Sequence, residues 1–183
     1  MKRINEIFES LQGEGFHTGT AAVFVRFSGC NLRCPFCDTQ HETYTEMSEE
    51  DIARKVSQYK APWVILTGGE PSLQATETLV DRLHALGKRV AMETNGTHAV
   101  PTNLDWLTLS PKEGKDPVLT QADEVKVVYQ AGVDVERWHS GIRADHYFLQ
   151  PCSCQNTSEV VRYILEHPYW RLSLQTHKYI GIE

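Results

Sequence analysis

The chain has 183 residues, of which 40% are hydrophobic, and a formal net charge of −6 at pH 7. This length suits one core, and the lack of a long polar or Gly/Ser-rich linker predicts a single domain over residues 1–183. The charge argues against a broad nucleic-acid or anionic-membrane surface, which needs clustered Lys and Arg, and no apolar run approaches the ~20 residues of a membrane span.

Short apolar, β-branched or aromatic runs predict seven strands in chain order. They lie at 22–27, 63–69, 89–96, 104–112, 124–129, 146–151 and 171–177. Helical spacing of apolar residues between several of these runs predicts three amphipathic helices. The apolar positions are Ile52, Val56 and Tyr59; Leu79, Leu83 and Leu86; and Val160, Ile164 and Leu165.

The expected helices also carry end signals. Ser48 and Asp51 have the spacing of a capping box before the first helix. Gly87 stands where a C-cap glycine belongs after the second, and Pro168 closes the third. The connections 97–103, 113–123 and 130–145 are less clearly helical.

Alternating strands and helices predict parallel strands joined by right-handed crossovers, in either an open doubly wound sheet or a curved, incomplete barrel. Polar residues follow five of the strands, and both architectures bind ligands at that edge. Ordinary βα turns are also polar and glycine-rich, but five such turns together favour a shared site. The residues are Thr67 to Glu70, Glu93 to Asn95, Ser110 to Lys112, Gln150 and His177.

Three of the five cysteines lie within eight residues, as Cys30-x3-Cys34-x2-Cys37, directly after the strand at 22–27. An odd number of cysteines, three of them too close together for a disulfide framework, favours a reducing cytoplasmic setting and metal binding. Thiolates suit zinc or an iron–sulfur cluster. His41 has the spacing to complete a Cys3His zinc site, so the cysteine spacing alone leaves both metals open.

The cysteine loop, with Phe36 before its last cysteine, resembles the signature of the radical S-adenosylmethionine (SAM) superfamily. Gly68-Gly69-Glu70-Pro71 resembles the GGEP motif of that superfamily. The resemblance implies an α/β fold, an incomplete, open (β/α)6-type TIM-like barrel of parallel strands. It also implies a [4Fe–4S] cluster on the three cysteines, with the amino and carboxylate groups of SAM on the fourth iron.

Further segments narrow the resemblance to the 7-carboxy-7-deazaguanine synthases, and they run from one end of the chain to the other. That family converts 6-carboxy-5,6,7,8-tetrahydropterin into 7-carboxy-7-deazaguanine and ammonia, on the route to queuosine and related 7-deazapurines. The segments are Leu11 to Gly15, Arg26, Cys37 to Thr39, Thr67, Ser110 to Lys112, Gln150-Pro151 and Gln175 to Tyr179.

For the substrate, the resemblance implies that Leu11, Gln12 and Gly13 bind the pterin edge and that Glu14 contacts its amino groups. Arg26 alternates with Val25 and Phe27, so it points into the barrel if those two pack under the helices. It would bind the substrate carboxylate, or alternatively pair with a barrel carboxylate such as Glu93 or Glu124. The remaining implied substrate residues are Thr67, His177, which is expected on an extended segment with Ser173 and Gln175, and the terminal carboxylate of Glu183.

For SAM, the resemblance implies that Phe36 lies near the adenine, that Gly69 and Glu70 engage the methionyl amine, and that Glu93 binds the ribose. The other implied SAM residues are Cys37, Asp38, Gly68, Ser110, Pro111, Lys112, Gln150, Pro151, Cys152 and Ser153. The hydroxyl of Thr39 would bind Mg2+ together with substrate oxygens and water; a helix N-cap is the alternative for Asp38 and Thr39. Cys152 and Cys154 are too few for a second cubane cluster and are expected to be packing thiols.

By the same resemblance, SAM yields a 5′-deoxyadenosyl radical that takes hydrogen from C6 of the pterin, the ring contracts, ammonia leaves and SAM is regenerated. No protein acid or base is required. The implied partners are an electron donor such as flavodoxin or ferredoxin and a second copy of the chain. Two alternatives remain open at this point: another radical SAM enzyme of the glycyl-radical activase type, and a Cys3His zinc module.

Overall fold

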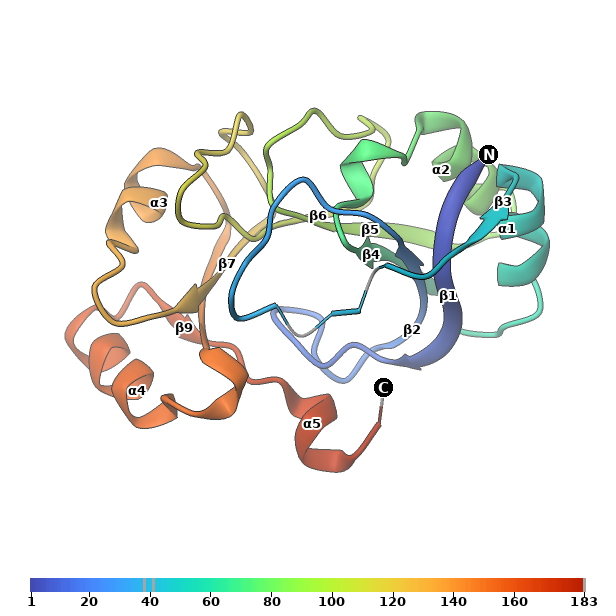
Figure 1. Ribbon diagram of the computed structural model, residues 1–183. Helices are drawn as coiled ribbons and strands as arrows, with labels where there is room; N and C mark the ends of the chain where they lie inside the picture. The colour runs from blue at the N-terminus through green and yellow to red at the C-terminus, as the bar shows by residue number, and fades with distance from the viewer. Residues whose placement is uncertain (38, 41, 183) are drawn as a thin grey trace.

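The computed structural model describes residues 1–37, 39–40 and 42–182, and within these it holds one nine-stranded sheet. The strand order is β3-β1-β2-β4-β5-β6-β7-β8-β9. From β2 to β9 every neighbouring pair is parallel, and the sheet curves into an open barrel with the helices outside it (Figure 1).

The bounds of the strands and helices are as follows. The strands are β1 Lys2–Leu11, β2 Ala21–Phe27, β3 Thr45–Met47, β4 Trp63–Gly68, β5 Arg89–Thr94, β6 Trp106–Leu109, β7 Glu124–Tyr129, β8 His146–Pro151 and β9 Arg171–Leu172. The helices are α1 Glu49–Val56, α2 Glu77–His84, α3 Glu136–Gly141, α4 Thr157–Glu166 and α5 Thr176–Ile180, with 3-10 turns η1 Pro71–Leu73 and η2 Cys152–Cys154.

The predicted fold class, an open α/β barrel, is confirmed, but the prediction of parallel strands is wrong at the N-terminal edge. There β1 pairs antiparallel with β2, and β3 pairs antiparallel with β1. β1 was not among the predicted strands, because most of its residues are only half-buried and its apolar residues do not alternate strictly with polar ones. A hairpin therefore extends the parallel sheet.

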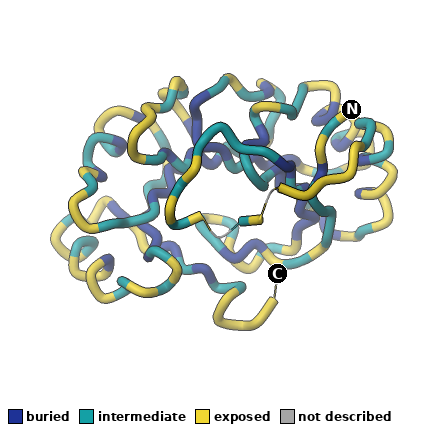
Figure 2. The backbone as a smooth tube through the Cα atoms, viewed as in Figure 1, coloured by how far each residue is buried: buried dark blue, intermediate teal, exposed yellow. Residues whose placement is uncertain are grey.

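The helices on the outer face cover two apolar clusters, whose buried residues are among the dark-blue segments of Figure 2. Val23, Val25 and Phe27 of β2 pack in the first cluster with Ile52 and Val56 of α1. The residues between them face inward, so β2 places Arg26 on the concave side of the sheet, as predicted from the alternation. The second cluster joins β7 and β8 to α3 and α4.

The end signals of α1 and α2 are confirmed. Ser48 and Asp51 form the reciprocal capping box, and Gly87 has a positive φ of 73° just after α2. The C-terminal predictions are partly wrong: Leu165 is 78% exposed, and the strand expected at 171–177 ends at Leu172. Residues 176–180 are helical instead.

The loop between β1 and β2 folds under the barrel and closes the end at which the parallel strands begin. Phe16 stacks on Trp106 and His146, with ring centroids 5.0 and 4.3 Å apart, and His17 lies 4.6 Å from Trp63. These three partners are the first residues of β6, β8 and β4. With this end closed by aromatic rings, the polar start of the same loop, Gln12 to Gly15, lies inside the barrel. Within the described residues, no helix is both long and apolar enough to cross a membrane.

Candidate active site

A cavity of about 670 Å3 opens at the C-terminal ends of the parallel strands. All five of the polar strand ends singled out in the sequence contribute to its wall, so the structure brings them together. The implied site residues that line it are Leu11, Gln12, Gly13, Glu14, Arg26, Cys34, Phe36, Cys37, Thr39, Thr67, Gly68, Gly69, Glu70, Glu93, Ser110, Lys112, Gln150, Pro151, Cys152, Ser153 and His177.

Four implied site residues stand apart from this set. Cys30 and Pro111 are not among the described residues that line the cavity; Pro111 is buried and Cys30 is partly exposed. Asp38 and Glu183 lie outside the described residues, as does His41, the fourth ligand of the alternative zinc site.

The cysteine loop follows β2 and bounds one side of the cavity. Cys37 is exposed, while Cys30 and Cys34 are partly exposed, and all are free thiols. Burial raises the pKa of Cys30, and the neighbouring Cys34 and Cys37 raise it further. Burial also raises the pKa of Cys34, but the positive charge of Lys112 opposes this shift. The three thiols are thus close enough to interact, with a cation beside one of them.

The GGEP turn after β4 is fixed directly against the start of the cysteine loop. Gly69 N–H donates to the carbonyl of Phe27 and Glu70 N–H to that of Gly29, each at 2.9 Å. A Cβ on Gly69 would lie 2.1 Å from the Gly29 oxygen, and Gly68 has a φ of 113°. Both glycines are therefore required by close backbone approach. The resemblance implies that the cysteine loop and the GGEP turn both contact SAM, and the fold places these two motifs side by side.

The carboxylate of Glu70 is used by the protein itself. It is 1% exposed and accepts hydrogen bonds from Ser72 N–H, Thr94 Oγ1 and Asn95 N–H at 2.6–3.0 Å. Both oxygens are occupied, so Glu70 orders the turn and ties it to the end of β5.

A side-chain network that the sequence reading missed ties the cysteine loop to β5. Asn31 Nδ2 donates to Thr97 Oγ1 at 2.8 Å, and Asn95 Nδ2 donates to Asn31 Oδ1 at 3.1 Å. Thr97 in turn donates to Asn95 from both its backbone and its hydroxyl. The sequence shows Asn31 as a polar residue inside the cysteine signature, but it does not show the partner Thr97, which lies 66 positions away.

Arg26 enters the cavity from β2, and its partner differs from both carboxylates considered in the sequence. Its Nε donates to Glu6 Oε1 of β1 at 2.6 Å, and its guanidinium lies 5.5 Å from the Phe8 ring centroid. Glu93 and Glu124 instead lie near Lys126. Because the Glu6 side chain is 42% exposed, this surface pair is weak and leaves Arg26 available to an anion in the cavity.

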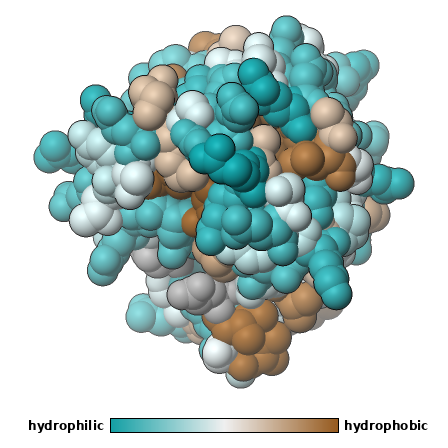
Figure 3. Space-filling view, turned by 90° about the vertical axis from the view of Figure 1, so that its right-hand side faces the viewer, coloured by the Kyte–Doolittle hydropathy of each residue, from teal (hydrophilic) through white to brown (hydrophobic). Residues whose placement is uncertain are grey.

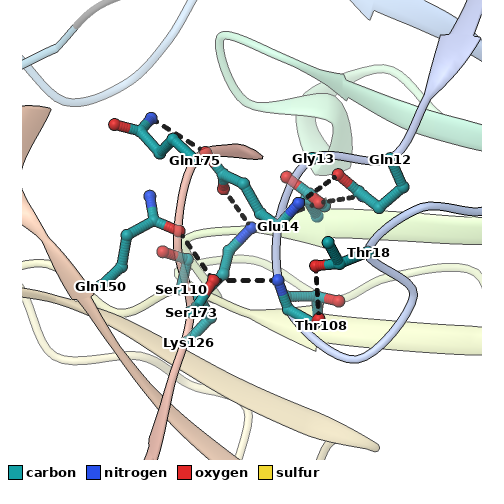
Figure 4. Close-up of polar contacts among 12 residues, drawn as sticks. Gln12, Gly13, Glu14, Thr18, Thr108, Ser110, Lys126, Gln150, Ser173 and Gln175 are labelled. Carbon is teal, nitrogen blue, oxygen red and sulfur yellow. Dashed lines mark hydrogen bonds and ion pairs between the residues drawn. The ribbon is translucent and has the colours of Figure 1, made fainter. Parts of the chain in front are cut away.

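A network of polar side chains lines part of the cavity (Figure 4). Lys126 Nζ lies 2.5 Å from Glu14 Oε2 and 3.3 Å from Glu93 Oε1. Gln175 Nε2 donates to Glu14 at 2.9 Å, and Gln12 Nε2 donates to Glu93 at 2.9 Å. Burial favours neutral Glu14, but the charge and hydrogen bond of Lys126 outweigh it and hold the pKa of Glu14 below its usual value.

Near this network, Lys112 Nζ donates to the Ser110 carbonyl and hydroxyl at 2.9 and 2.6 Å, and burial lowers the pKa of Lys112. Gln150 accepts from Ser173 at 3.0 Å. The following turn has two non-glycine residues of positive φ, Ser153 at 47° and Cys154 at 62°. Such a conformation is costly and bends the chain back against the cavity.

His177 reaches the cavity from α5, so the extended conformation expected for it is wrong. Its ring packs on the β1–β2 loop so closely that a Cβ on Gly13 would lie 2.2 Å from His177 Nδ1. Thr176 N–H and Oγ1 both donate to the Gly13 carbonyl, at 2.9 and 3.0 Å. The C-terminal helix and the loop therefore form one wall.

Comparisons with known proteins agree with this geometry. The family model of the radical SAM superfamily matches residues 24–141. The 7-carboxy-7-deazaguanine synthase of Bacteroides thetaiotaomicron is 59% identical over 182 residues, covering 100% of this chain and 99% of that protein. The chain belongs to the 7-carboxy-7-deazaguanine synthase family. The synthase of Bradyrhizobium diazoefficiens is 40% identical, covering 98% of both chains. The crystal structure of QueE from Escherichia coli superposes with a TM-score of 0.82 at 31% identity, covering 96% of this chain and 94% of that one.

Membership of this synthase family makes the chain a radical SAM enzyme and implies a [4Fe–4S] cluster and SAM. Family membership therefore excludes the two alternatives that the sequence left open, a glycyl-radical activase and a Cys3His zinc module. The residues present fit the two groups: three thiols lie on one loop, and two glycines leave the adjoining turn free of side chains. Among the described residues, no three His, Cys, Asp or Glu side chains are arranged to hold a single metal ion. A cavity of this volume is of the size that holds small ligands.

Proposed function

We propose that this chain converts 6-carboxy-5,6,7,8-tetrahydropterin to 7-carboxy-7-deazaguanine with release of ammonia, in the biosynthesis of queuosine and other 7-deazapurines. The observation that carries the proposal is that one cavity joins the cysteine loop to a second set of polar groups suited to a pterin acid. That second set includes a cation suited to a carboxylate, Arg26, and an anion suited to N–H donors, Glu14.

In the half of the cavity beside the cysteine loop, Cys30, Cys34 and Cys37 would hold the cluster. The GGEP backbone would receive the amine of SAM, and Ser110 with Lys112 would receive its carboxylate. Lys112 supports this assignment because it is a partly buried cation that, among the described residues, donates to the carbonyl and hydroxyl of Ser110. Phe36 and the segment Gln150 to Ser153 line the same cavity and would enclose the adenosine.

In the other half, Arg26 would exchange its exposed partner Glu6 for the substrate carboxylate, with Thr67 beside it. A guanidinium binds a carboxylate through two parallel N–H donors, which a monodentate bond to Glu6 does not use in full. Glu14 and Gln12 would take the amino-pyrimidine edge, together with backbone groups of Leu11 and Gly13. His177 and the terminal carboxylate of Glu183 would complete the pocket.

Thr39 lines the cavity between these halves and would bind Mg2+ through its hydroxyl. A single hydroxyl is a weak magnesium ligand, so substrate oxygens and water would supply the other positions. Bound there, the ion would neutralise charge on the substrate carboxylate next to Arg26.

The chain's own contribution to the reaction is placement and shielding. When bound, the cluster and SAM supply a carbon-centred radical that can take a hydrogen atom from the pterin. Arg26 and Glu14 fix the two ends of the pterin so that one carbon faces that source. The aromatic floor of Phe16, Trp106 and His146 closes the lower end of the barrel to water. We assign no side chain as a general acid or base for the ring contraction.

We further propose that residues 1–183 act as a single domain in the cytoplasm, receive electrons from a flavodoxin or ferredoxin, and form a homodimer. An apolar contact surface supports the last point. Ile180 is 60% exposed and Ile182 is 37% exposed at the C-terminal end. Figure 3 shows a mostly hydrophilic side with an apolar patch at its lower edge and a smaller apolar cluster higher on the right.

The test is anaerobic incubation of cluster-loaded protein with SAM, a reductant, Mg2+ and 6-carboxytetrahydropterin. We expect ammonia and 7-carboxy-7-deazaguanine to form, and Cys34→Ala to abolish both together with the visible absorption of the cluster. Cluster-loaded protein that binds SAM but makes no product would instead point to another radical SAM reaction. Colourless, zinc-loaded protein with full activity would refute the cluster assignment.

A further inference from the structure

Lys126 is a buried cation in the middle of β7 that the sequence reading left without a role. Val125 and Val127 pack outward in the second apolar cluster, so Lys126 points into the barrel. Its side chain is 4% exposed and makes contacts at 2.5 Å to Glu14 and 3.3 Å to Glu93. A lysine at such a depth is retained only where its charge is matched.

Three carboxylates surround this one cation: Glu14, Glu93 and Glu124. Glu124 has other partners, since it accepts from Phe16 N–H at 2.7 Å and from Thr108 Oγ1 at 3.3 Å. Burial raises the pKa of Glu124, whereas the pKa of Lys126 is raised because its attraction to the three carboxylates outweighs its burial. Lys126 therefore balances chiefly Glu14 and Glu93.

These two carboxylates come from different elements and meet at the same ammonium group. Glu14 comes from the β1–β2 loop, where the pterin edge is proposed to lie, and Glu93 comes from the end of β5, on the side proposed for the ribose. Without a cation between them, two carboxylates held close together repel each other and one takes up a proton. Figure 4 shows Lys126 and Gln175 approaching Glu14 from different elements.

We infer that Lys126 is a positioning residue for substrate recognition, which acts through Glu14 and holds it ionised and aimed at the N–H donors of the pterin. This inference rests on the proposed function. Glu14 would then be able to accept hydrogen bonds from the substrate because a residue of β7, Lys126, keeps it charged. Lys126 itself need not touch the substrate. A ring that presents N–H donors at that edge is then bound, and one that presents acceptors is rejected.

Loss of the cation would change the protonation of Glu14. Its burial would then raise the pKa of Glu14 and leave a protonated carboxyl that can donate a hydrogen bond. Binding of the pterin would weaken near neutral pH and recover as the pH rises. The other charged or titratable groups near Glu14 are Glu93 on β5, Glu124 on β7, Lys112 after β6 and His177 on α5.

The test is titration calorimetry of 6-carboxytetrahydropterin into anaerobic, cluster-loaded protein with SAM present and reductant omitted, so that no turnover occurs. We expect Lys126→Met to weaken binding about ten- to hundredfold and to make it depend on pH, with recovery at higher pH. Lys60→Met, which removes an exposed lysine, should bind as the wild type does. Binding by Lys126→Met within threefold of the wild type at all pH values would overturn the inference.

A second comparison distinguishes a role of Lys126 through Glu14 from a general disruption of the pocket. It compares the pterin affinity of Glu14→Gln with that of the double variant Glu14→Gln/Lys126→Met, which leaves no unpaired charge at position 14. If Lys126 acts through Glu14, the two variants bind the pterin equally. A further tenfold loss in the double variant would contradict the inference, and this comparison decides the matter even where Lys126→Met alone fails to fold. A wild-type protein that binds no pterin would refute the proposed function itself.

Discussion

The junction between the GGEP turn and the cysteine loop makes Gly69→Ala the most informative single substitution for the architecture of the site. The new Cβ would lie 2.1 Å from the Gly29 oxygen and 2.5 Å from its carbonyl carbon, where real contacts are essentially never under 3.0 Å. The two segments would have to separate by about 0.9 Å or more. That movement stretches the hydrogen bonds of Gly69 N–H to the Phe27 carbonyl and of Glu70 N–H to the Gly29 carbonyl.

Two weakened backbone hydrogen bonds and overpacking together cost about 3 kcal/mol. For a chain of this length, that lowers the thermal unfolding midpoint by about 6–12 °C. The assay is anaerobic thermal denaturation, with iron content and visible absorption measured in parallel. Gly141→Ala is the matched control, since its Cβ meets nothing within 4 Å and its φ is not positive. Equal midpoints and equal iron contents for the two variants would refute the reasoning.

Three further predictions follow from other contacts. Arg26→Lys should raise KM for the pterin about tenfold with little change in cluster content, because an ammonium cannot bind a carboxylate through a planar fork; an unchanged KM would remove Arg26 from the carboxylate site. Burial lowers the pKa of His17, so the unfolded chain takes up a proton that folded His17 does not. The contribution of neutral His17 to stability is thus fully present above about pH 6.5 and is lost as the pH falls below that value. In thermal denaturation, the unfolding midpoint of His17→Phe should fall less than that of the wild type between pH 7.5 and pH 5.5. Ser48→Ala removes the capping box of α1 and should cost about 1 kcal/mol in chemical denaturation, whereas Ser57→Ala, beyond the other end of α1, should cost less.

The features that could be predicted from the sequence are those that local patterns encode. Alternation in β2 placed Arg26 on the inner face, and the Ser48–Asp51 spacing gave the start of α1. The polar residues at the strand ends could be assigned to one site because parallel strands of a barrel end at the same edge. The cysteine spacing alone could not separate zinc from an iron–sulfur cluster; the second motif and the resemblance did that.

What was missed depends on contacts between distant segments. Lys126 lies in mid-strand, away from the polar strand ends that indicate the site, and its partner Glu14 is 112 positions away. The alternation of Ser173, Gln175 and His177 suggested a strand, but Thr176 pairs with the Gly13 carbonyl and starts α5. The resemblance pointed to Glu70 as a ligand of SAM, but not to its hydrogen bonds with Ser72, Thr94 and Asn95, which tie the turn to a segment 25 positions away. A charged residue flanked by two buried valines was the available signal for Lys126.

The most direct test of the central claim is the amount of product formed per molecule of SAM. Cluster-loaded protein would be incubated anaerobically with reductant, Mg2+, excess 6-carboxytetrahydropterin and a limiting amount of SAM, and 7-carboxy-7-deazaguanine would be quantified by mass spectrometry. We predict many molecules of product, with equal ammonia, for each SAM supplied. No product, or product that stops at one molecule per SAM while 5′-deoxyadenosine accumulates, would contradict the account.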